Sequence, residues 1–152
     1  MLPVLRFNGY GENSGLLYHS PHAVMYQEEL YPTALHLFEA LKFLDHRPDL
    51  ADRIRECERV EDVSVISADL AEYTRRDWGT VALAKMDEVL YLKFRQHREL
   101  RALLLNTYPA ELVYAESGDH FWGDGAGNGR NELGNSLMRV RGRLRAEGGM
   151  PP

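Results

Sequence analysis

Two ionisable residues lie three positions apart in the otherwise apolar segment Tyr31–Leu44. At helical spacing, Glu39 and Lys42 share one stripe of a helix with Phe38. Lys and Glu are rarely buried unless they are paired. One interpretation is a surface ion pair with both charges in solvent, which contributes little to stability. The other is a cleft in which Glu39 acts on water or a proton, while a desolvated Lys42 attacks a sugar aldehyde as an amine.

A glycine-rich segment, residues 116–134, carries many functional side chains. Five glycines from Gly118 to Gly129 are interleaved with them. Glycine permits positive φ and a close approach of the backbone to a ligand, and aromatic rings can stack on a planar base. An ordinary surface loop is the alternative interpretation. The functional side chains are Asp119, His120, Phe121, Trp122, Asp124, Asn128, Arg130 and Asn131.

Common nucleotide-binding motifs do not describe this loop. The order G-x-x-x-x-G-K-[ST] of a phosphate-binding P-loop is absent, and the strand–helix order of a dinucleotide site does not follow Gly125-Ala-Gly-Asn-Gly. Asn131 stands where the next helix is expected to begin. It therefore suits an N-cap, and the N-terminus of that helix would also favour an anion.

Other kinds of site find little support in the sequence. The six histidines show no H-E-x-x-H or equivalent spacing, so we expect no metal site. The single cysteine, Cys57, excludes an intramolecular disulfide and a cysteine-based zinc cluster. Serine nucleophile chemistry lacks a G-x-S-x-G motif. No organic cofactor is expected.

Hydrophobic periodicity predicts the helices and strands that position these residues, and Pro and Gly mark where those elements begin and end. The pattern predicts an α+β fold, a small helix-rich domain with a few short strands that spans residues 1–146, followed by a flexible tail at 147–152. The expected strands are Val4–Phe7, Ala23–Tyr26 and Leu112–Ala115, and the expected helices are Pro32–Leu44, Asp49–Glu58, Asp69–Thr74, Trp78–Phe94, Glu99–Asn106 and Asn131–Arg145.

Composition narrows the class of protein. A chain of 152 residues with 44% hydrophobic and 27% charged residues can fill the core of one domain. The net charge of −5 disfavours duplex nucleic acid held mainly by phosphate neutralisation, but leaves room for a local phosphate pocket. No apolar run approaches the roughly 18 residues of a membrane span, and no secretory signal is visible. We therefore expect a cytoplasmic protein with nuclear access possible, and with no membrane or obligate protein partner.

Several spaced motifs resemble the NADAR (YbiA-like) family of small N-glycosidase domains. The resemblance runs from about Leu16 to Leu144, nearly the whole chain, with the motifs in the family's order. They are Pro32-Thr33 with His36 and Phe38, Lys42-Phe43, Arg76-Asp-Trp78, Lys93-Phe94 with Gln96-His-Arg-Glu-Leu-Arg-Ala-Leu-Leu104, Trp122-Gly-Asp-Gly125, Asn131, Leu133-Gly134 and Leu137-Met138.

The chain departs from the family pattern in two places. Ala34-Leu35 replaces the family's Ser-Glu, and Glu39 replaces a Gln. Positions 35 and 39 are about one helical turn apart, so Glu39 can take over the role of the missing carboxylate; alternatively, this branch has lost or changed the activity. Leu16-Leu-Tyr-His19 stands where the family has F-S-N-F. These differences indicate a fungal-type or otherwise divergent branch.

The resemblance implies hydrolysis of a bond between ribose C1 and an amino nitrogen. The family's substrates are ADP-ribose joined to guanine, including in modified nucleic acid, and phosphoribosylamino-pyrimidine intermediates of riboflavin synthesis. A non-catalytic ADP-ribose or nucleotide reader is the alternative. On this hypothesis Trp122 stacks on the base, Glu39 and Asp124 transfer protons, and Lys42 forms a transient Schiff base with the opened ribose. Other expected substrate contacts are His36, Arg76, Trp78, Gly123, Gly125, Arg130 and Asn131, with Arg139 a further candidate for holding phosphate.

Overall fold

The computed structural model describes residues 1–148. Most of the expected tail therefore lies outside the described residues. Its first residue, Glu147, caps the last helix and accepts a hydrogen bond from the Tyr91 hydroxyl at 2.7 Å.

Four short strands form two separate two-stranded sheets. Strand β1 (Val4–Phe7) pairs in parallel with β4 (Glu111–Tyr114), although about a hundred residues separate them in the sequence. Strands β2 (Val24–Tyr26) and β3 (Glu29–Tyr31) form an antiparallel hairpin. The strands expected near residues 4, 23 and 112 are confirmed within one residue at each end.

The hairpin strand β3 was not expected, because its turn lacks the usual residues. Gln27 and Glu28 both have positive φ, 49° and 68°. A two-residue turn of this kind normally uses Asn-Gly or Asp-Gly, which tolerate the left-handed conformation at little cost. The local sequence therefore gives no turn signal there.

Helices make up most of the chain. One expectation was wrong: residues 60–69, not 69–74, form a regular helix, and a single 3₁₀ turn (Ala71–Tyr73) follows it. Only Val63 and Ser67 of this helix are buried, so its apolar periodicity is weak. The helices are α1 (Ala34–Ala40), α2 (Pro48–Arg55), α3 (Val60–Asp69), α4 (Trp78–Gln96), α5 (Arg98–Asn106) and α6 (Glu132–Ala146).

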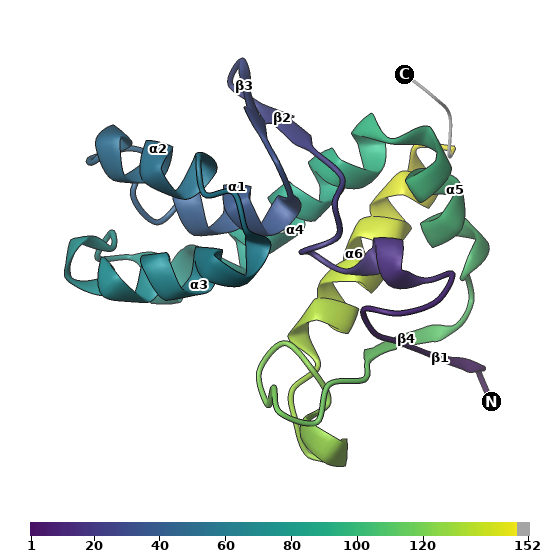
Figure 1. The fold of residues 1–152 in the computed structure, drawn as a ribbon. Helices are drawn as coiled ribbons and strands as arrows, with labels where there is room; N and C mark the ends of the chain where they lie inside the picture. Colours follow the sequence, from purple (N-terminus) through teal and green to yellow (C-terminus); the bar gives the residue numbers. More distant parts are fainter. Residues whose placement is uncertain (149–152) are drawn as a thin grey trace.

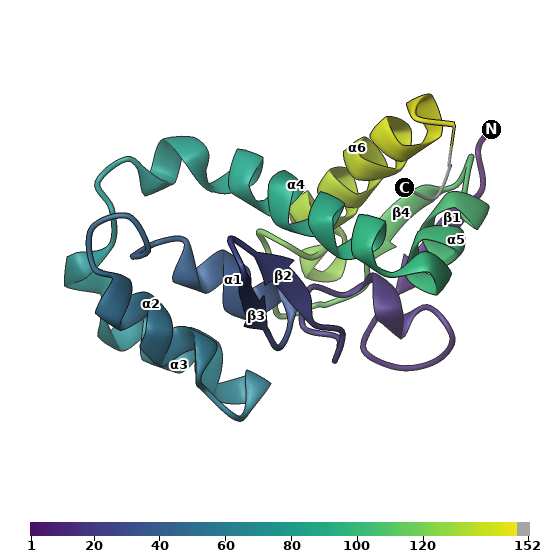
Figure 2. The same ribbon diagram turned by 90° about the horizontal axis from the view of Figure 1, so that it is seen from above.

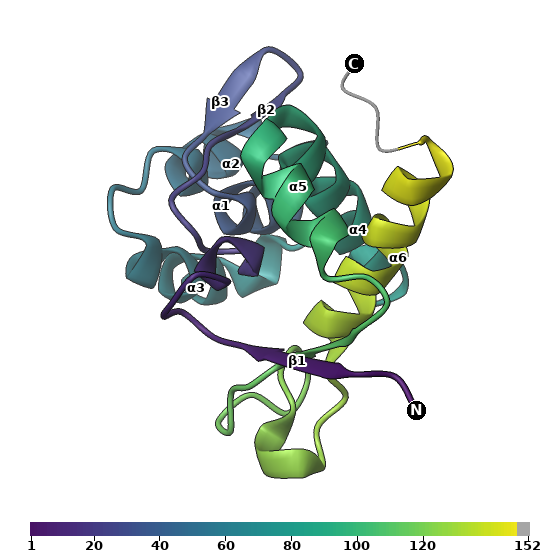
Figure 3. The same cartoon turned by 90° about the vertical axis from the view of Figure 1, so that its right-hand side faces the viewer.

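The long helix α4 connects the two halves of the fold (Figures 1 and 2). Helices α1, α2 and α3 pack together on one side and reach α4 through α1, whereas α5, α6 and the β1–β4 sheet lie on the other. Figure 3 shows β1 and the loop after β4 at the end of this second group. Among the described residues, no helix is both long and apolar enough to cross a bilayer.

Buried side chains from both halves meet in one core. Phe43 and Leu37 contribute from the α1 side, Phe94 and Leu90 from α4, and Leu137 from α6, each without solvent exposure. The expected α+β, helix-rich architecture is confirmed. Because α1 ends at Ala40 and the chain continues in turns to His46, α1 is shorter than its apolar pattern indicates.

Candidate active site

A pocket of about 400 Å³ lies where α1, the beginning of α4 and the loop before α6 meet. Five of the residues expected from sequence to act on substrate are brought together here, although they come from three separate segments. The lining residues are Phe38, Glu39, Lys42, Trp78, Gly79, Ala82, Leu83, Phe121, Trp122 and Arg130.

Glu39 and Lys42 form an ion pair in the wall of this pocket. Lys42 Nζ donates to Glu39 Oε1 at 2.8 Å and to the Ser67 hydroxyl of α3 at 3.2 Å. The Glu39 side chain is 9% exposed and that of Lys42 is 21% exposed. A freely solvated surface pair does not describe this arrangement. Because Glu39 is a direct acceptor of a Lys42 proton, the pair is arranged for proton transfer.

Helix α1 holds the pair in place from its first turn. Thr33 caps the helix, and its hydroxyl accepts a hydrogen bond from the His36 backbone N–H at 3.1 Å. Phe38 and Glu39 of α1, and Lys42 in the turn that follows the helix, line the same pocket. The sequence spacing predicted that Glu39 and Lys42 lie side by side, but left open whether they form a surface pair or line a cleft. The structure places the pair in the wall of a pocket.

Aromatic side chains build the apolar walls. The Phe38 ring lies 5.1 Å from Trp78 and 5.5 Å from Trp122, centroid to centroid, and it is perpendicular to the latter. Phe121 packs edge-on against Trp122 at 4.8 Å. Lys42 Nζ is 5.8 Å from the Trp78 ring centroid. The pocket therefore places indole surfaces beside an ion pair, a combination that suits a planar base joined to a polar sugar.

Arg130 contributes a positive charge at an exposed edge of the pocket. Its side chain is 62% exposed, and it donates to Glu132 at 2.6 Å while its guanidinium lies 4.9 Å from the Phe121 ring centroid. The flat guanidinium keeps further N–H donors for a phosphate. Arg130 is therefore placed to contact an anionic group of a substrate that extends out of the pocket.

The loop that carries Trp122 is held by its own hydrogen bonds. The Asp119 carboxylate accepts from the backbone N–H groups of Phe121 and Trp122 at 3.0 and 2.8 Å. A Cβ on Gly123 would lie 2.9 Å from two backbone carbonyl oxygens, and a Cβ on Gly125, where φ is 52°, would lie 2.5 Å from the His120 ring. Gly123 and Gly125 are buried and needed as glycines for the packing of the loop, and neither lines the pocket beside Glu39 and Lys42.

Asp124 is directed to the fold rather than to the pocket. Its carboxylate pairs with Arg6 of β1 at 2.5 Å, and the hydrogen bond from this guanidinium is the main cause that lowers the pKa of Asp124. The backbone N–H of Asp124 donates to the Tyr114 carbonyl oxygen of β4. The structure therefore does not bring the expected second catalytic carboxylate to the Glu39–Lys42 pair.

The Asn131 side chain joins the start of α6 to β4. Its side-chain amide donates to the Leu112 carbonyl oxygen and accepts from the Tyr114 N–H, each at 2.9 Å. It stands at the N-cap position in the left-handed conformation, with φ of 54°, and makes no side-chain cap hydrogen bond. The amide thus takes the place of strand partners for β4 and does not line the pocket. The expected N-cap hydrogen bond is not made, which corrects that expectation.

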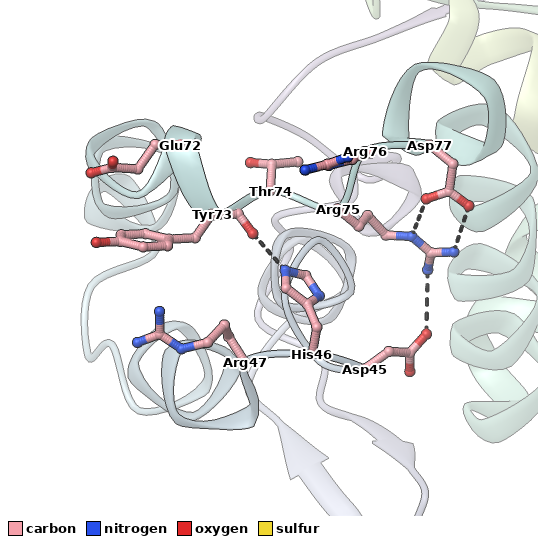
Figure 4. Close-up of a pocket in the computed structure, with 9 residues that line it drawn as sticks. All are labelled: Asp45, His46, Arg47, Glu72, Tyr73, Thr74, Arg75, Arg76 and Asp77. Carbon is pink, nitrogen blue, oxygen red and sulfur yellow. Dashed lines mark hydrogen bonds and ion pairs between the residues drawn. The ribbon is translucent and has the colours of Figure 1, made fainter.

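His36 and Arg76 are not among the residues that line the pocket of the Glu39–Lys42 pair. His36 is 1% exposed; Nδ1 lies 2.8 Å from the Thr33 hydroxyl and Nε2 lies 2.9 Å from the Cys57 carbonyl oxygen. Burial lowers the pKa of His36, so the neutral ring braces α1. Arg76 lines a different pocket of about 550 Å³ beside the turn before α4 (Figure 4).

In that second pocket most of the cations are already paired. Arg75 pairs with Asp77 at 2.6 Å and with Asp45 at 3.6 Å (Figure 4).

Arg139, a further candidate phosphate ligand, lies outside both pockets. It donates two hydrogen bonds to Asp87 of α4 and so links α6 to that helix. Across residues 1–148, no group of three or more His, Cys, Asp or Glu side chains could hold a metal ion.

Two residues near the pocket were missed from the sequence. Ser67 accepts from Lys42, but it lies on α3, a helix that the sequence pattern did not predict. Tyr18 packs edge-on against Trp122 at 6.1 Å, and it lies in the segment that departs from the family pattern. The unusual tyrosine in place of a motif residue was the available signal.

Comparison with known proteins agrees with this architecture. The NADAR domain family matches residues 10–145. The chain is 41% identical to N-glycosidase YbiA of Escherichia coli over 77% of this chain and 72% of that protein. It is 33% identical to an N-glycosidase of Nostoc punctiforme, over 83% and 82% of the two chains.

A solved structure gives the same result for the fold. The NMR structure of the E. coli protein YbiA superimposes with a TM-score of 0.82 at 32% identity, covering 97% of this chain and 89% of the other. A riboflavin biosynthesis protein of Vibrio vulnificus is 34% identical over 86% of this chain, which spans 35% of that longer protein. The described chain belongs to the NADAR domain family.

Proposed function

We propose that this protein is an N-glycosidase that uses Glu39 and Lys42 to cleave the bond between ribose C1 and an amino nitrogen of ADP-ribosylated guanine. The reaction class follows from relatives named N-glycosidases at 33–41% identity over most of the chain. The observation that carries the assignment of the site is the 2.8 Å pair of Glu39 and Lys42 between the aromatic walls.

The geometry supports a covalent route through Lys42. Glu39 accepts a proton from the ammonium, which frees the amine. Opening of the ribose ring breaks the bond from C1 to the ring oxygen, which takes the proton from Glu39, and leaves a protonated imine between C1 and the base nitrogen. The Lys42 amine adds to C1 and displaces the base as its neutral amine. Water then hydrolyses the lysine imine, and the released ribose aldehyde closes again.

The shape of the pocket supports a large substrate with a planar base. A volume of about 400 Å³ is in the usual range for ligand sites, and it suits a base with one ribose. The exposed Arg130 would meet the diphosphate of ADP-ribose where it leaves the pocket. Guanine would lie against Trp122, because an indole ring stacks well on a purine.

A second substrate class has support from one relative. The Vibrio vulnificus protein is named for riboflavin biosynthesis, and phosphoribosylamino-pyrimidines present the same arrangement of aminopyrimidine ring, ribose and phosphate. A non-catalytic reader of ADP-ribose is less well supported. A reader gains nothing from a desolvated carboxylate paired with a lysine, because desolvating both charges costs free energy.

The test is mass spectrometry after incubation with an oligonucleotide that carries ADP-ribosyl-guanine. Wild type should release ADP-ribose and restore guanine, whereas Glu39→Gln and Lys42→Ala should lower kcat by about 10² to 10⁴. Borohydride should trap a covalent ribosyl adduct in wild type but not in Lys42→Ala. Glu61→Gln and Lys85→Ala, whose side chains lie outside the pocket lining, are the matched controls.

The outcomes separate the candidates. Cleavage of a phosphoribosylamino-pyrimidine but not of the oligonucleotide would reassign the substrate and keep the site. Binding of ADP-ribose without turnover of either compound would favour the reader. Full activity of Glu39→Gln would contradict the proposed role of the ion pair.

A further inference from the structure

Lys93 is a fully buried lysine that the proposed reaction does not use. Its side chain projects from α4, and the ammonium donates to the carbonyl oxygens of Gly15 and Leu17 at 2.7 and 2.6 Å and to the Ser20 hydroxyl at 2.7 Å. An ammonium has three donors and no acceptor, so the three acceptors satisfy it completely. Burial lowers the pKa of Lys93 to about 7.

The three acceptors lie on both sides of Tyr18 in the loop between β1 and β2. Tyr18 lies between Leu17 and Ser20, and its own carbonyl oxygen accepts from the Leu35 N–H at 2.8 Å. Lys93 therefore holds the loop to α4, and Leu35 holds it to the first turn of α1. Two independent anchors determine the position of Tyr18.

The ring of Tyr18 supports the aromatic wall of the pocket. It packs edge-on against Trp122 at 6.1 Å and against Tyr114 at 6.3 Å, and Trp122 in turn meets Phe38 of α1. Burial, Tyr114 and the carboxylates of Asp119 and Glu39 raise the pKa of Tyr18, so its phenol stays protonated near the ion pair.

We propose that Lys93 is a positioning residue for the glycosidase reaction: it holds residues 15–20 so that Tyr18 fixes the Trp122 wall beside Glu39 and Lys42. The role rests on the proposed function of the pocket. A route of direct contacts leads from Lys93 through the loop to Tyr18 and then to Trp122.

The free-energy cost of desolvating a buried charge indicates that Lys93 does more than fill volume in the core. An apolar side chain of similar length would fill the same volume without desolvating a charge, and such exchanges are often neutral or stabilising. What an apolar residue cannot supply is the hydrogen bonds from α4 to two loop carbonyls and a hydroxyl. The Leu17 carbonyl oxygen also accepts from the Ser20 N–H, and the Ser20 hydroxyl also contacts His22 Nδ1. These bonds stay within the loop, so the loss of the ammonium removes the polar tie between the loop and α4. The ammonium is the group that determines the conformation of the loop.

The test follows Trp122 itself. The chain has two tryptophans, so a Trp78→Phe background leaves Trp122 as the single emitter. In that background, Lys93→Met should increase acrylamide quenching of Trp122 by about twofold, because a loosened wall admits solvent. Lys85→Met, also on α4, is the matched control and should leave quenching unchanged. Circular dichroism confirms that each variant is folded.

Kinetics with Trp78 restored give the second readout. Lys93→Met should lower kcat for ADP-ribosyl-guanine by about tenfold or more while KM changes little, since a base held slightly out of place binds but reacts slowly. Unchanged quenching would overturn the inference, and so would a kcat within about twofold of wild type. If Lys93→Met does not fold, Ser20→Ala, which removes one acceptor and keeps the ammonium, should increase quenching by a smaller factor; no increase would overturn it too.

The two proposals fail separately. Quenching of Trp122 requires no substrate, so it tests the role of Lys93 even if wild type proves inactive on ADP-ribosyl-guanine. Normal quenching in a variant of a confirmed glycosidase would remove the positioning role and leave the proposed function intact.

Discussion

Asp124 shows how a residue chosen for its chemistry can serve the fold. Its ion pair with Arg6 joins the loop before α6 to β1, and this pairing lowers the pKa of Asp124. The carboxylate therefore stabilises the folded protein when it is ionised. Glu39, in contrast, has its partner inside the pocket. The two carboxylates are distinguished by what they pair with, not by residue type.

We predict that Asp124→Asn lowers the free energy of unfolding at pH 7. Because the folded-state pKa is lowered, the stabilisation is present above the unfolded pKa of about 3.9 and is lost as the pH falls through the folded pKa. In urea titrations the difference between the variant and wild type should therefore shrink at acid pH. The exposed Asp69 offers the control Asp69→Asn.

Turnover provides the second readout for Asp124. The kcat of Asp124→Asn should fall far less than that of Glu39→Gln, because Asp124 does not face the Glu39–Lys42 ion pair. A loss of activity equal to that of Glu39→Gln with unchanged stability would contradict this placement and restore Asp124 to the reaction.

At the scale of elements, α6 lies directly against β4. The backbone of Gly134 approaches the strand so closely that a Cβ would lie 2.2 Å from the Leu112 carbonyl oxygen, and Asn131 fills the space beside it. This contact sets the start of α6, and with it the end of the loop that carries Trp122 and Arg130. The close approach depends on the absence of a side chain at Gly134.

Gly134→Ala should destabilise the protein by about 2–3 kcal/mol, because the strand and helix must separate to admit the methyl group. In the same helix, a Cβ on Gly142 would meet nothing within 4 Å. Gly142→Ala should therefore stabilise the protein by about 0.5–1 kcal/mol through helix propensity. Urea unfolding measures both; equal effects would show that α6 does not depend on close contact with β4.

The molecule as a whole assembles the pocket from three distant segments. Residues 38–42 belong to the α1 side, residues 78–83 begin α4, and residues 121–130 precede α6. A ligand in the pocket contacts all three, so it should stabilise the whole fold rather than a single element.

Glu39→Gln provides the inactive protein that this test requires. With uncleaved ADP-ribosyl-guanine oligonucleotide at 100 times its Kd, the free energy of unfolding should rise by about 2.7 kcal/mol. Circular dichroism and tryptophan emission should report the same transition. Trp122→Ala should bind more weakly and show a smaller shift at the same ligand concentration. Binding without any shift in stability would mean that the ligand binds the unfolded chain as tightly as the folded protein, which would contradict a site built by the tertiary structure. An equal shift in Trp122→Ala would contradict binding in this pocket.

Local sequence was sufficient to predict features whose signal lies within a single helix or loop. The α4 pattern, the spacing of Glu39 and Lys42 and the aromatic character of the 116–134 loop each depend on neighbours within a few turns. These features survive in the structure as expected. Strand β3 and helix α3 were missed because their local signals are weak: the turn uses Gln27 and Glu28, and α3 buries few apolar residues.

By itself, the sequence determined the family and the helix-rich class, and it supplied a set of candidate site residues. Tertiary structure decided which of those residues meet. Trp122, Asp124 and Asn131 lie within ten residues, yet one faces the pocket, one pairs with β1 and one binds β4. The residues that these three side chains contact are distant in the sequence, so no periodic pattern around Trp122, Asp124 or Asn131 indicates them. Their hydrogen bonds and close contacts arise only when the core brings the elements together.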